Sequence, residues 1–82
     1  MLRIPKRRRP IHPGEMLQEE FLKPLDLSQV ELAHRIGVPF QRVSQIVRRR
    51  RGVTPDTALR LARLFGTTPN FWLNLQQRWD LS

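Results

Sequence analysis

The stretch "LSQVELAHRIGVPFQRVSQIV", Leu27–Val47, decides the fold. It holds two short amphipathic helical patterns, separated by a turn that begins at Gly37. Ser28 followed by Glu31 predicts a helix start, because the serine hydroxyl accepts a bond from the N–H three residues on, and the glutamate can reach back. Gly37 can take the left-handed conformation that ends such a helix. Two helices joined by a short glycine turn predict a helix-turn-helix motif over residues 28–47.

Apolar residues recur at helical spacing in both patterns and mark the sides that face inward. Ala33 is small, which lets the second helix cross closely over the first. The predicted inward residues are Leu32, Ala33, Ile36, Val43, Ile46 and Val47.

Three more helices are predicted around the motif. Residues 15–23 have helical periodicity and are expected to stop at Pro24, because proline disfavours helical geometry in the residue before it. Another helix follows the capping residue Thr54 and ends at Gly66, and the last covers residues 69–79. No segment alternates with period two, so the expected fold is all-α with five helices.

Composition excludes several classes of protein. With 82 residues the chain allows one domain, predicted over residues 14–82 behind a basic arm at 1–13. It has no cysteine, and His12 and His34 are too few for a metal site, so no metal, cofactor or catalytic activity is expected. His12 is expected to cap the first helix and His34 to be exposed. No apolar run suits a membrane span or a signal peptide, which predicts a cytoplasmic protein.

The net charge of +8 is concentrated in the arm and in residues 35–51, which predicts nucleic acid as a partner. In a helix-turn-helix the second helix lies in the major groove, and its first residues reach base edges. Glutamine suits adenine and arginine suits guanine, whereas Phe40 either packs on a thymine methyl or turns inward. Gln29, at the start of the first helix, is placed to bind phosphate. The predicted base-contacting residues are Phe40, Gln41, Arg42, Ser44 and Gln45.

The run of arginines after the second helix lies beside the groove that this helix would occupy. Arginine has a planar fork that suits phosphate oxygens, so phosphate contacts are expected, with a solvated loop as the alternative. The run consists of Arg48, Arg49, Arg50 and Arg51. The basic arm is a candidate for the minor groove, although diffuse attraction or contact with a protein partner remains open. Its candidate residues are Lys6, Arg7, Arg8 and Arg9.

From His12 to Ser82 the sequence resembles the HigA-type antitoxins, or VapI group, of the Xre/Cro helix-turn-helix family, whose domain is lambda-repressor-like. The most specific shared segment is "TPDTALRLARLFGTTPNFWLNLQ", residues 54–76. The resemblance implies a homodimer that binds a palindromic double-stranded DNA operator, represses its own operon and neutralises a small mRNA-endonuclease toxin. A stand-alone Xre/Cro-type repressor without a toxin is the alternative. A protein-interaction module with a vestigial motif is a third.

The chain departs from this family at the arginine run, where an Asn-Gly pair commonly replaces Arg48 and Arg49. If the turn needs a positive φ, Arg49 costs about 1–2 kcal/mol relative to glycine. Phe40 is a second departure, because a polar or basic residue is more usual there.

Two protein-binding surfaces are also expected. The last helix has more aromatic residues than a small core needs, so it is the candidate dimer interface. Its candidate residues are Phe71, Trp72, Leu75 and Trp79. An acidic strip on the first helix, formed by Glu15, Glu19 and Glu20, is a candidate contact for a basic toxin.

Overall fold

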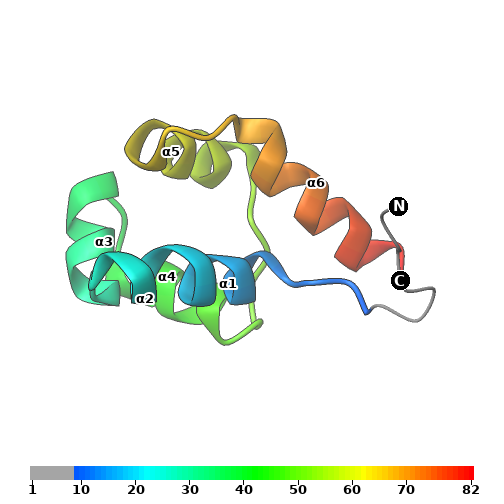
Figure 1. Ribbon diagram of the computed structural model, residues 1–82, viewed down its shortest axis with the longest axis horizontal. Coiled ribbons are helices and arrows are strands. Elements are labelled where there is room, and N and C mark those ends of the chain that lie inside the picture. The colour runs from blue at the N-terminus through cyan, green and yellow to red at the C-terminus, as the bar shows by residue number, and fades with distance from the viewer. Residues whose placement is uncertain (1–8) are drawn as a thin grey trace, which may run out of the picture.

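The computed structural model describes residues 9–82, and this part of the chain contains helices but no strands (Figure 1). The first three labelled elements follow one another without a break and form one long helical segment. Four separate helices follow, so the predicted all-α fold with five helical segments is confirmed. The elements are α1 (Pro13–Met16), η1 (Leu17–Leu22), α2 (Lys23–Leu25), α3 (Gln29–Ile36), α4 (Phe40–Val47), α5 (Pro55–Phe65) and α6 (Pro69–Asp80).

The first helical segment does not stop before Pro24, as the sequence predicted, but continues to Leu25. In a regular α-helix the proline ring clashes with the carbonyl four residues earlier. Here η1 precedes it as a π-helix, in which the Lys23 N–H donates to the carbonyl of Gln18, five residues back. This wider turn changes the register just before the proline. The segment ends instead at Asp26, whose φ of 54° is left-handed.

Capping side chains fix the starts of the later helices as predicted. The Ser28 hydroxyl accepts from the N–H of Glu31 at 3.0 Å, and the Thr68 hydroxyl accepts from that of Phe71 at 3.1 Å. Gly37 and Gly66 end α3 and α5 with φ angles of 73° and 75°. Ser28 and Gly37 thus fix both ends of α3, whereas the start of α4 has no side-chain cap and α4 is held by packing on α3.

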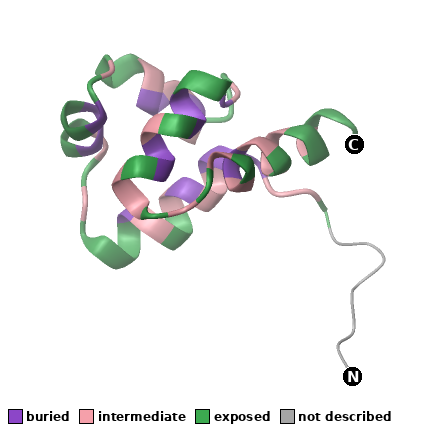
Figure 2. Ribbon diagram, turned by 90° about the horizontal axis from the view of Figure 1, so that it is seen from above, coloured by how far each residue is buried: buried purple, intermediate pink, exposed green. Residues whose placement is uncertain are grey.

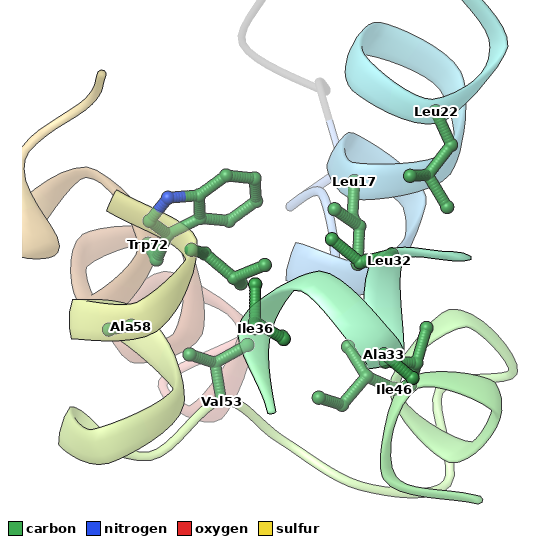
Figure 3. Packing of buried hydrophobic residues seen from close by; sticks show 11 residues of the cluster. Leu17, Leu22, Leu32, Ala33, Ile36, Ile46, Val53, Ala58 and Trp72 are labelled. Atoms are coloured by element: carbon green, nitrogen blue, oxygen red, sulfur yellow. The ribbon is translucent and has the colours of Figure 1, made fainter. Parts of the chain in front are cut away.

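The helices pack around one apolar core, seen as the purple ribbon segments that face each other in Figure 2. Helix α3 packs on α4 and α5 on α6, while α1 contacts both α4 and α6. Figure 3 shows how residues from η1, α3, α4, α5 and α6 meet there. The core consists of Leu17, Leu22, Leu32, Ala33, Ile36, Val43, Ile46, Val53, Ala58, Leu61 and Trp72.

Trp72 lies in the centre of this core with 0% of its surface exposed. Its indole N–H donates to the hydroxyl of Thr67 at 2.8 Å, which satisfies its polar atom. Phe21 packs against it at a tilt and Phe71 edge-on, each with a ring centroid 5.0 Å away. Trp72 is therefore a core residue, and its prediction as part of a dimer interface is wrong, because packing within the monomer already uses its whole surface.

The packed part of the chain extends N-terminal to Gly14, where the sequence predicted the domain to begin. His12 is buried, and its Nδ1 accepts from the N–H of Gly14 at 2.9 Å, which confirms the predicted capping role. Its ring meets that of Trp79 edge-on at 5.0 Å. His34 is exposed, also as predicted. Of the predicted arm residues, Lys6, Arg7 and Arg8 lie outside the described part of the chain.

Candidate nucleic-acid interface

Helix α4 is held in place by its apolar side and leaves its opposite side open. Val43 and Ile46 are buried against the rest of the motif. On the other side Gln41 is exposed and Gln45 is half-buried. Phe40 is 45% exposed at the first turn of the helix, so it does not turn inward. This row of a phenyl ring and two amides is the surface that the motif would present to a major groove.

Ser44 does not belong to this row, although the sequence placed it among the base-contacting residues. Its surface is only 9% exposed. The prediction that Ser44 contacts bases is therefore wrong.

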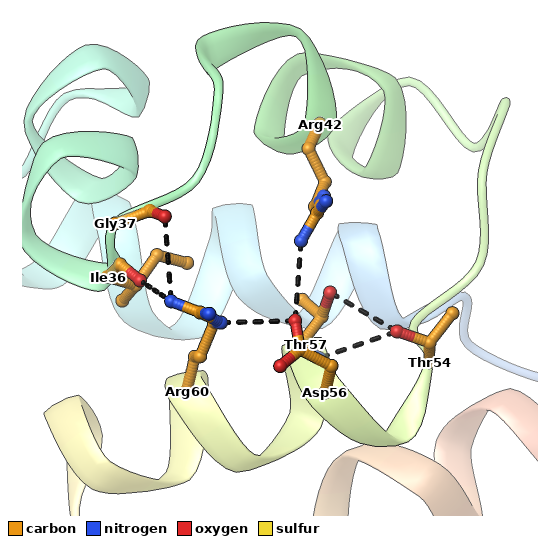
Figure 4. A network of polar contacts seen from close by, with 7 residues as sticks. All are labelled: Ile36, Gly37, Arg42, Thr54, Asp56, Thr57 and Arg60. Atoms are coloured by element: carbon orange, nitrogen blue, oxygen red, sulfur yellow. Dashed lines mark hydrogen bonds and ion pairs between the residues drawn. The ribbon is translucent and has the colours of Figure 1, made fainter.

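Arg42 leaves α4 towards α5 and joins a polar network at the edge of the candidate interface (Figure 4). Its Nη1 lies 3.4 Å from Oδ2 of Asp56, and its side chain is 31% exposed. The same carboxylate oxygen accepts from Nε of Arg60 at 3.1 Å. The network thus links the recognition helix to the first turns of α5.

The arginine run forms a turn that closes the end of α4. The N–H of Arg50 donates to the carbonyl of Gln45 at 2.8 Å, and that of Arg49 donates to Ile46 at 3.0 Å. This is the Schellman pattern of helix ends, in which the residue that donates the inner of the two bonds is left-handed and usually glycine. Arg49 occupies that position with a φ of 64°, as the departure from Asn-Gly predicted.

The side chains of the run divide into two groups. Nη2 of Arg49 donates to Oε1 of Glu15 on α1 at 3.0 Å, so this guanidinium turns towards the protein's own carboxylate. The other members, Arg48, Arg50 and Arg51, are exposed on the turn. They are the cations that a phosphate beside α4 would meet first.

The Glu15 carboxylate also accepts two hydrogen bonds from the Arg9 guanidinium, of 3.1 and 3.0 Å. These hydrogen bonds, together with the charges of Arg9 and Arg49, lower the pKa of the Glu15 carboxyl against the opposing effect of desolvation. The same carboxylate raises the pKa of Arg9. Arg9, one of the candidates for the minor groove, is therefore paired within the protein.

The remaining predicted site residues lie away from this network. Gln29, at the first position of α3, is half-buried. Phe71, Leu75 and Trp79 on α6 are half-buried as well, so each keeps part of its surface open.

Three residues of this region were missed by the sequence reasoning: Glu15 as a partner of the arginine turn, Asp56 and Arg60. The spacing of Asp56 and Arg60, four apart just after the cap Thr54, is a signal for a helical ion pair. The contacts between Glu15 and Arg49, and between Arg42 and Asp56, join separate helices and have no local signal.

The described residues exclude some other kinds of site. No group of three or more histidine, aspartate or glutamate side chains in residues 9–82 is arranged to hold a metal ion. Within the same range, no helix has the length and apolar character that crossing a membrane requires.

Comparison with known proteins agrees with this geometry. The sequence profile of the helix-turn-helix family matches residues 19–72. Virulence-associated protein I of Dichelobacter nodosus is 54% identical over 71 residues, which cover 87% of this chain and 66% of that protein. The chain thus spans about two thirds of the length of that relative.

Two solved structures resemble this chain over most of its length. Antitoxin GraA is 53% identical with a TM-score of 0.88, and the match covers 90% of this chain and 80% of that one. The Pseudomonas aeruginosa antitoxin HigA, solved with the higBA promoter, is 48% identical with a TM-score of 0.87, covering 89% and 79%. The matched profile and these relatives show that the chain belongs to the helix-turn-helix family, within the group of HigA-type antitoxins.

Proposed function

We propose that this protein is a DNA-binding antitoxin that represses its own operon. The observation that carries the proposal is the exposed side of α4, where Phe40, Gln41 and Gln45 are followed by a turn with three exposed arginines. Amides on a helix suit base edges, and arginines beside the helix suit the flanking phosphates. The structure of the related HigA with its promoter supports this assignment. We also propose a cytoplasmic location, because a repressor must reach the DNA of its own operon.

The experiment is a footprint of the purified protein on the DNA upstream of its own gene. We expect two protected patches about one helical turn apart, as two recognition helices of a symmetric dimer would give. A shuffled duplex of the same composition is the control, at a salt concentration of about 150 mM, because affinity for any DNA rises at low salt. Equal affinity for the two duplexes would contradict operator binding.

We also propose that α6 forms the dimer interface, through Phe71, Leu75 and Trp79. These side chains remain partly open although α6 packs on α5, and the neighbouring Leu81 is 79% exposed. Replacing Leu75 by lysine should shift the protein to monomers in sedimentation and abolish the paired footprint. Asn74→Lys, which adds the same charge to an exposed position of the same helix, is the control and should leave the dimer intact. Dimers in both variants would rule out this surface.

We further propose that the acidic strip of Glu15, Glu19 and Glu20 binds a basic mRNA-endonuclease toxin. The strip borders a groove of about 510 Å³ that is also lined by Ile11, Met16, Phe21 and Phe71. Glu15 is paired with Arg9 and Arg49, and Glu19 with Lys23, so a basic toxin would have to replace these exposed partners. Co-purification with the small protein encoded beside this gene tests the assignment. Glu19→Lys with Glu20→Lys should lose the toxin and its neutralisation in cells. The control Glu31→Lys, on α3, should keep both.

A stand-alone repressor is the second candidate. The relative from Dichelobacter nodosus has a name that refers to virulence and not to a toxin, which is compatible with a repressor that acts alone. Operator binding without any co-purifying toxin, and without a toxin gene nearby, would select this alternative.

A further inference from the structure

Asp56 is the one carboxylate in the network at the edge of the candidate interface, and two arginines share it. Arg42 approaches from α4 and Arg60 from the next turn of α5 (Figure 4). A negative charge is unexpected beside a surface meant for phosphates, because it repels them. Its place beside a predicted base-contacting residue therefore calls for a functional explanation.

Asp56 itself is well anchored. It lies in the first turn of α5, where the helix dipole stabilises a carboxylate. Arg60 holds it from the side, and Nη1 of Arg60 also donates to the carbonyl of Ile36 at 2.7 Å, at the end of α3. The carboxylate is thus fixed relative to both α5 and the turn of the motif.

Arg42, in contrast, has a single and longer contact to this carboxylate, through Nη1 at 3.4 Å. A guanidinium carries five N–H donors in a rigid plane, so its remaining donors are still available. A contact at one corner restricts the rotamers of the long side chain while leaving a donor edge for another acceptor. An arginine that is already oriented loses less freedom when it binds a base.

We propose that Asp56 is a positioning residue, which orients Arg42 for base readout and so increases the specificity of the protein for its operator. This inference rests on the proposed DNA-binding function of α4. It assigns to Asp56 no direct contact with DNA. A carboxylate acting only by repulsion would weaken binding to every duplex alike, whereas a positioning carboxylate changes the ratio between operator and unrelated DNA.

The test is a double-mutant cycle of Asp56→Asn and Arg42→Ala, measured on the upstream DNA and on a shuffled duplex. Asparagine keeps an oxygen that can accept from Arg60 and removes only the charge. We expect Asp56→Asn to lower the preference for operator over shuffled DNA by about threefold to tenfold. In the Arg42→Ala background the same change should leave the preference unaltered. Asp56→Ser, which suits a first helical turn, should reproduce the loss, and melting curves check the fold of each variant.

Asp26→Asn, an equal change of charge at the left-handed end of α2, is the matched control and should keep the preference. An unchanged preference in Asp56→Asn, or a loss that persists without Arg42, would overturn the proposal. So would an equal gain of affinity on both duplexes, which would identify Asp56 as a repelling charge only. If Arg42→Ala keeps the full preference, the positioning role fails while operator binding stands. If the unmodified protein shows no preference, the proposed function itself fails.

Discussion

Arg49 has a backbone conformation that arginine rarely adopts. Its φ of 64° lies in the left-handed region, which costs a residue with a Cβ about 1–2 kcal/mol. The bond from its Nη2 to Glu15 is partly exposed and returns only about 0–1 kcal/mol. Stability alone therefore does not favour arginine over glycine here. What arginine adds at this position is a side-chain bond that joins the turn after α4 to Glu15 on α1.

Replacing Arg49 by glycine or by alanine separates backbone strain from the ion pair. Both variants lose the contact to Glu15, but only glycine relieves the left-handed strain. We expect Arg49→Gly to be more stable than Arg49→Ala by about 1 kcal/mol in urea unfolding. Equal stability of the two variants would mean that the turn relaxes and stores no strain.

His12 makes the folded protein sensitive to acid. Burial is the main reason that its pKa is lowered, and the nearby charge of Arg49 adds to this, while Asp80 and Glu15 partly oppose it. The unfolded chain therefore binds the proton more readily than the folded one, so stability rises with pH across this range. The contribution is complete above the ordinary histidine pKa of about 6.5 and is lost as the pH falls below it.

Unfolding free energies at pH values of about 7 and 5 test this prediction. The wild type should be less stable at the lower pH, because a proton on Nδ1 breaks the bond to the Gly14 N–H. Asparagine caps helices without titrating, so His12→Asn should show a smaller decrease. If the two proteins lose the same stability, groups other than His12 cause the acid sensitivity.

At the scale of elements, the contact between α1 and the end of α4 fixes the recognition helix. Gly14 lies so close to α4 that a Cβ would stand 1.8 Å from the carbonyl oxygen of Ile46. Backbone atoms cannot move aside as a flexible side chain can. The close approach also brings Glu15 within reach of Arg49, so packing and charge hold the same junction.

Gly14→Ala should therefore destabilise the protein by about 3 kcal/mol, since α1 must shift away from α4. Gly52→Ala is a useful comparison, because its Cβ would meet only the side chain of Gln76, at 2.6 Å. That side chain can turn away at the cost of its bond to the N–H of Val53, about 1 kcal/mol. Thermal unfolding compares the two, and similar losses would show that the α1–α4 contact is not tight.

Local signals in the sequence predicted most of these elements correctly. Ser28, Thr54, Thr68, Gly37 and Gly66 act through bonds or backbone preferences within a few residues, so their effect could be anticipated. The π-helix before Pro24 could not, because it depends on a shift of register that proline alone does not specify. The burial of Ser44 could not either, because a small polar residue in an amphipathic helix gives no clear sign of which side it faces.

For the whole molecule, positive and negative charges gather in two neighbouring regions, where α1 meets the end of α4. The exposed arginines Arg48, Arg50 and Arg51 lie on the turn after α4. The acidic strip begins at Glu15 on α1 and continues along η1. The sequence indicated this segregation from charge runs alone. It could not show that Arg49 and Arg9 pair with Glu15, because that depends on how α1 meets α4 in three dimensions.

Changing the three exposed arginines to alanine should weaken binding to operator and shuffled DNA alike. Each lost phosphate contact should reduce the slope of log affinity against log salt by about 0.9. Salt titrations of the variant and the wild type measure this difference. A slope identical to that of the wild type would mean that the turn does not contact DNA.

The central claim is that α4 reads bases while the turn after it binds phosphate, and one pair of matched titrations tests it most directly. Gln45→Ala and Arg48→Ala are each compared with the wild type on the upstream DNA and on a shuffled duplex. We predict that Gln45→Ala loses about 1–3 kcal/mol on the upstream DNA and almost nothing on the shuffled one, whereas Arg48→Ala loses equally on both. An equal loss on both duplexes for Gln45→Ala, or none on either, would contradict the account.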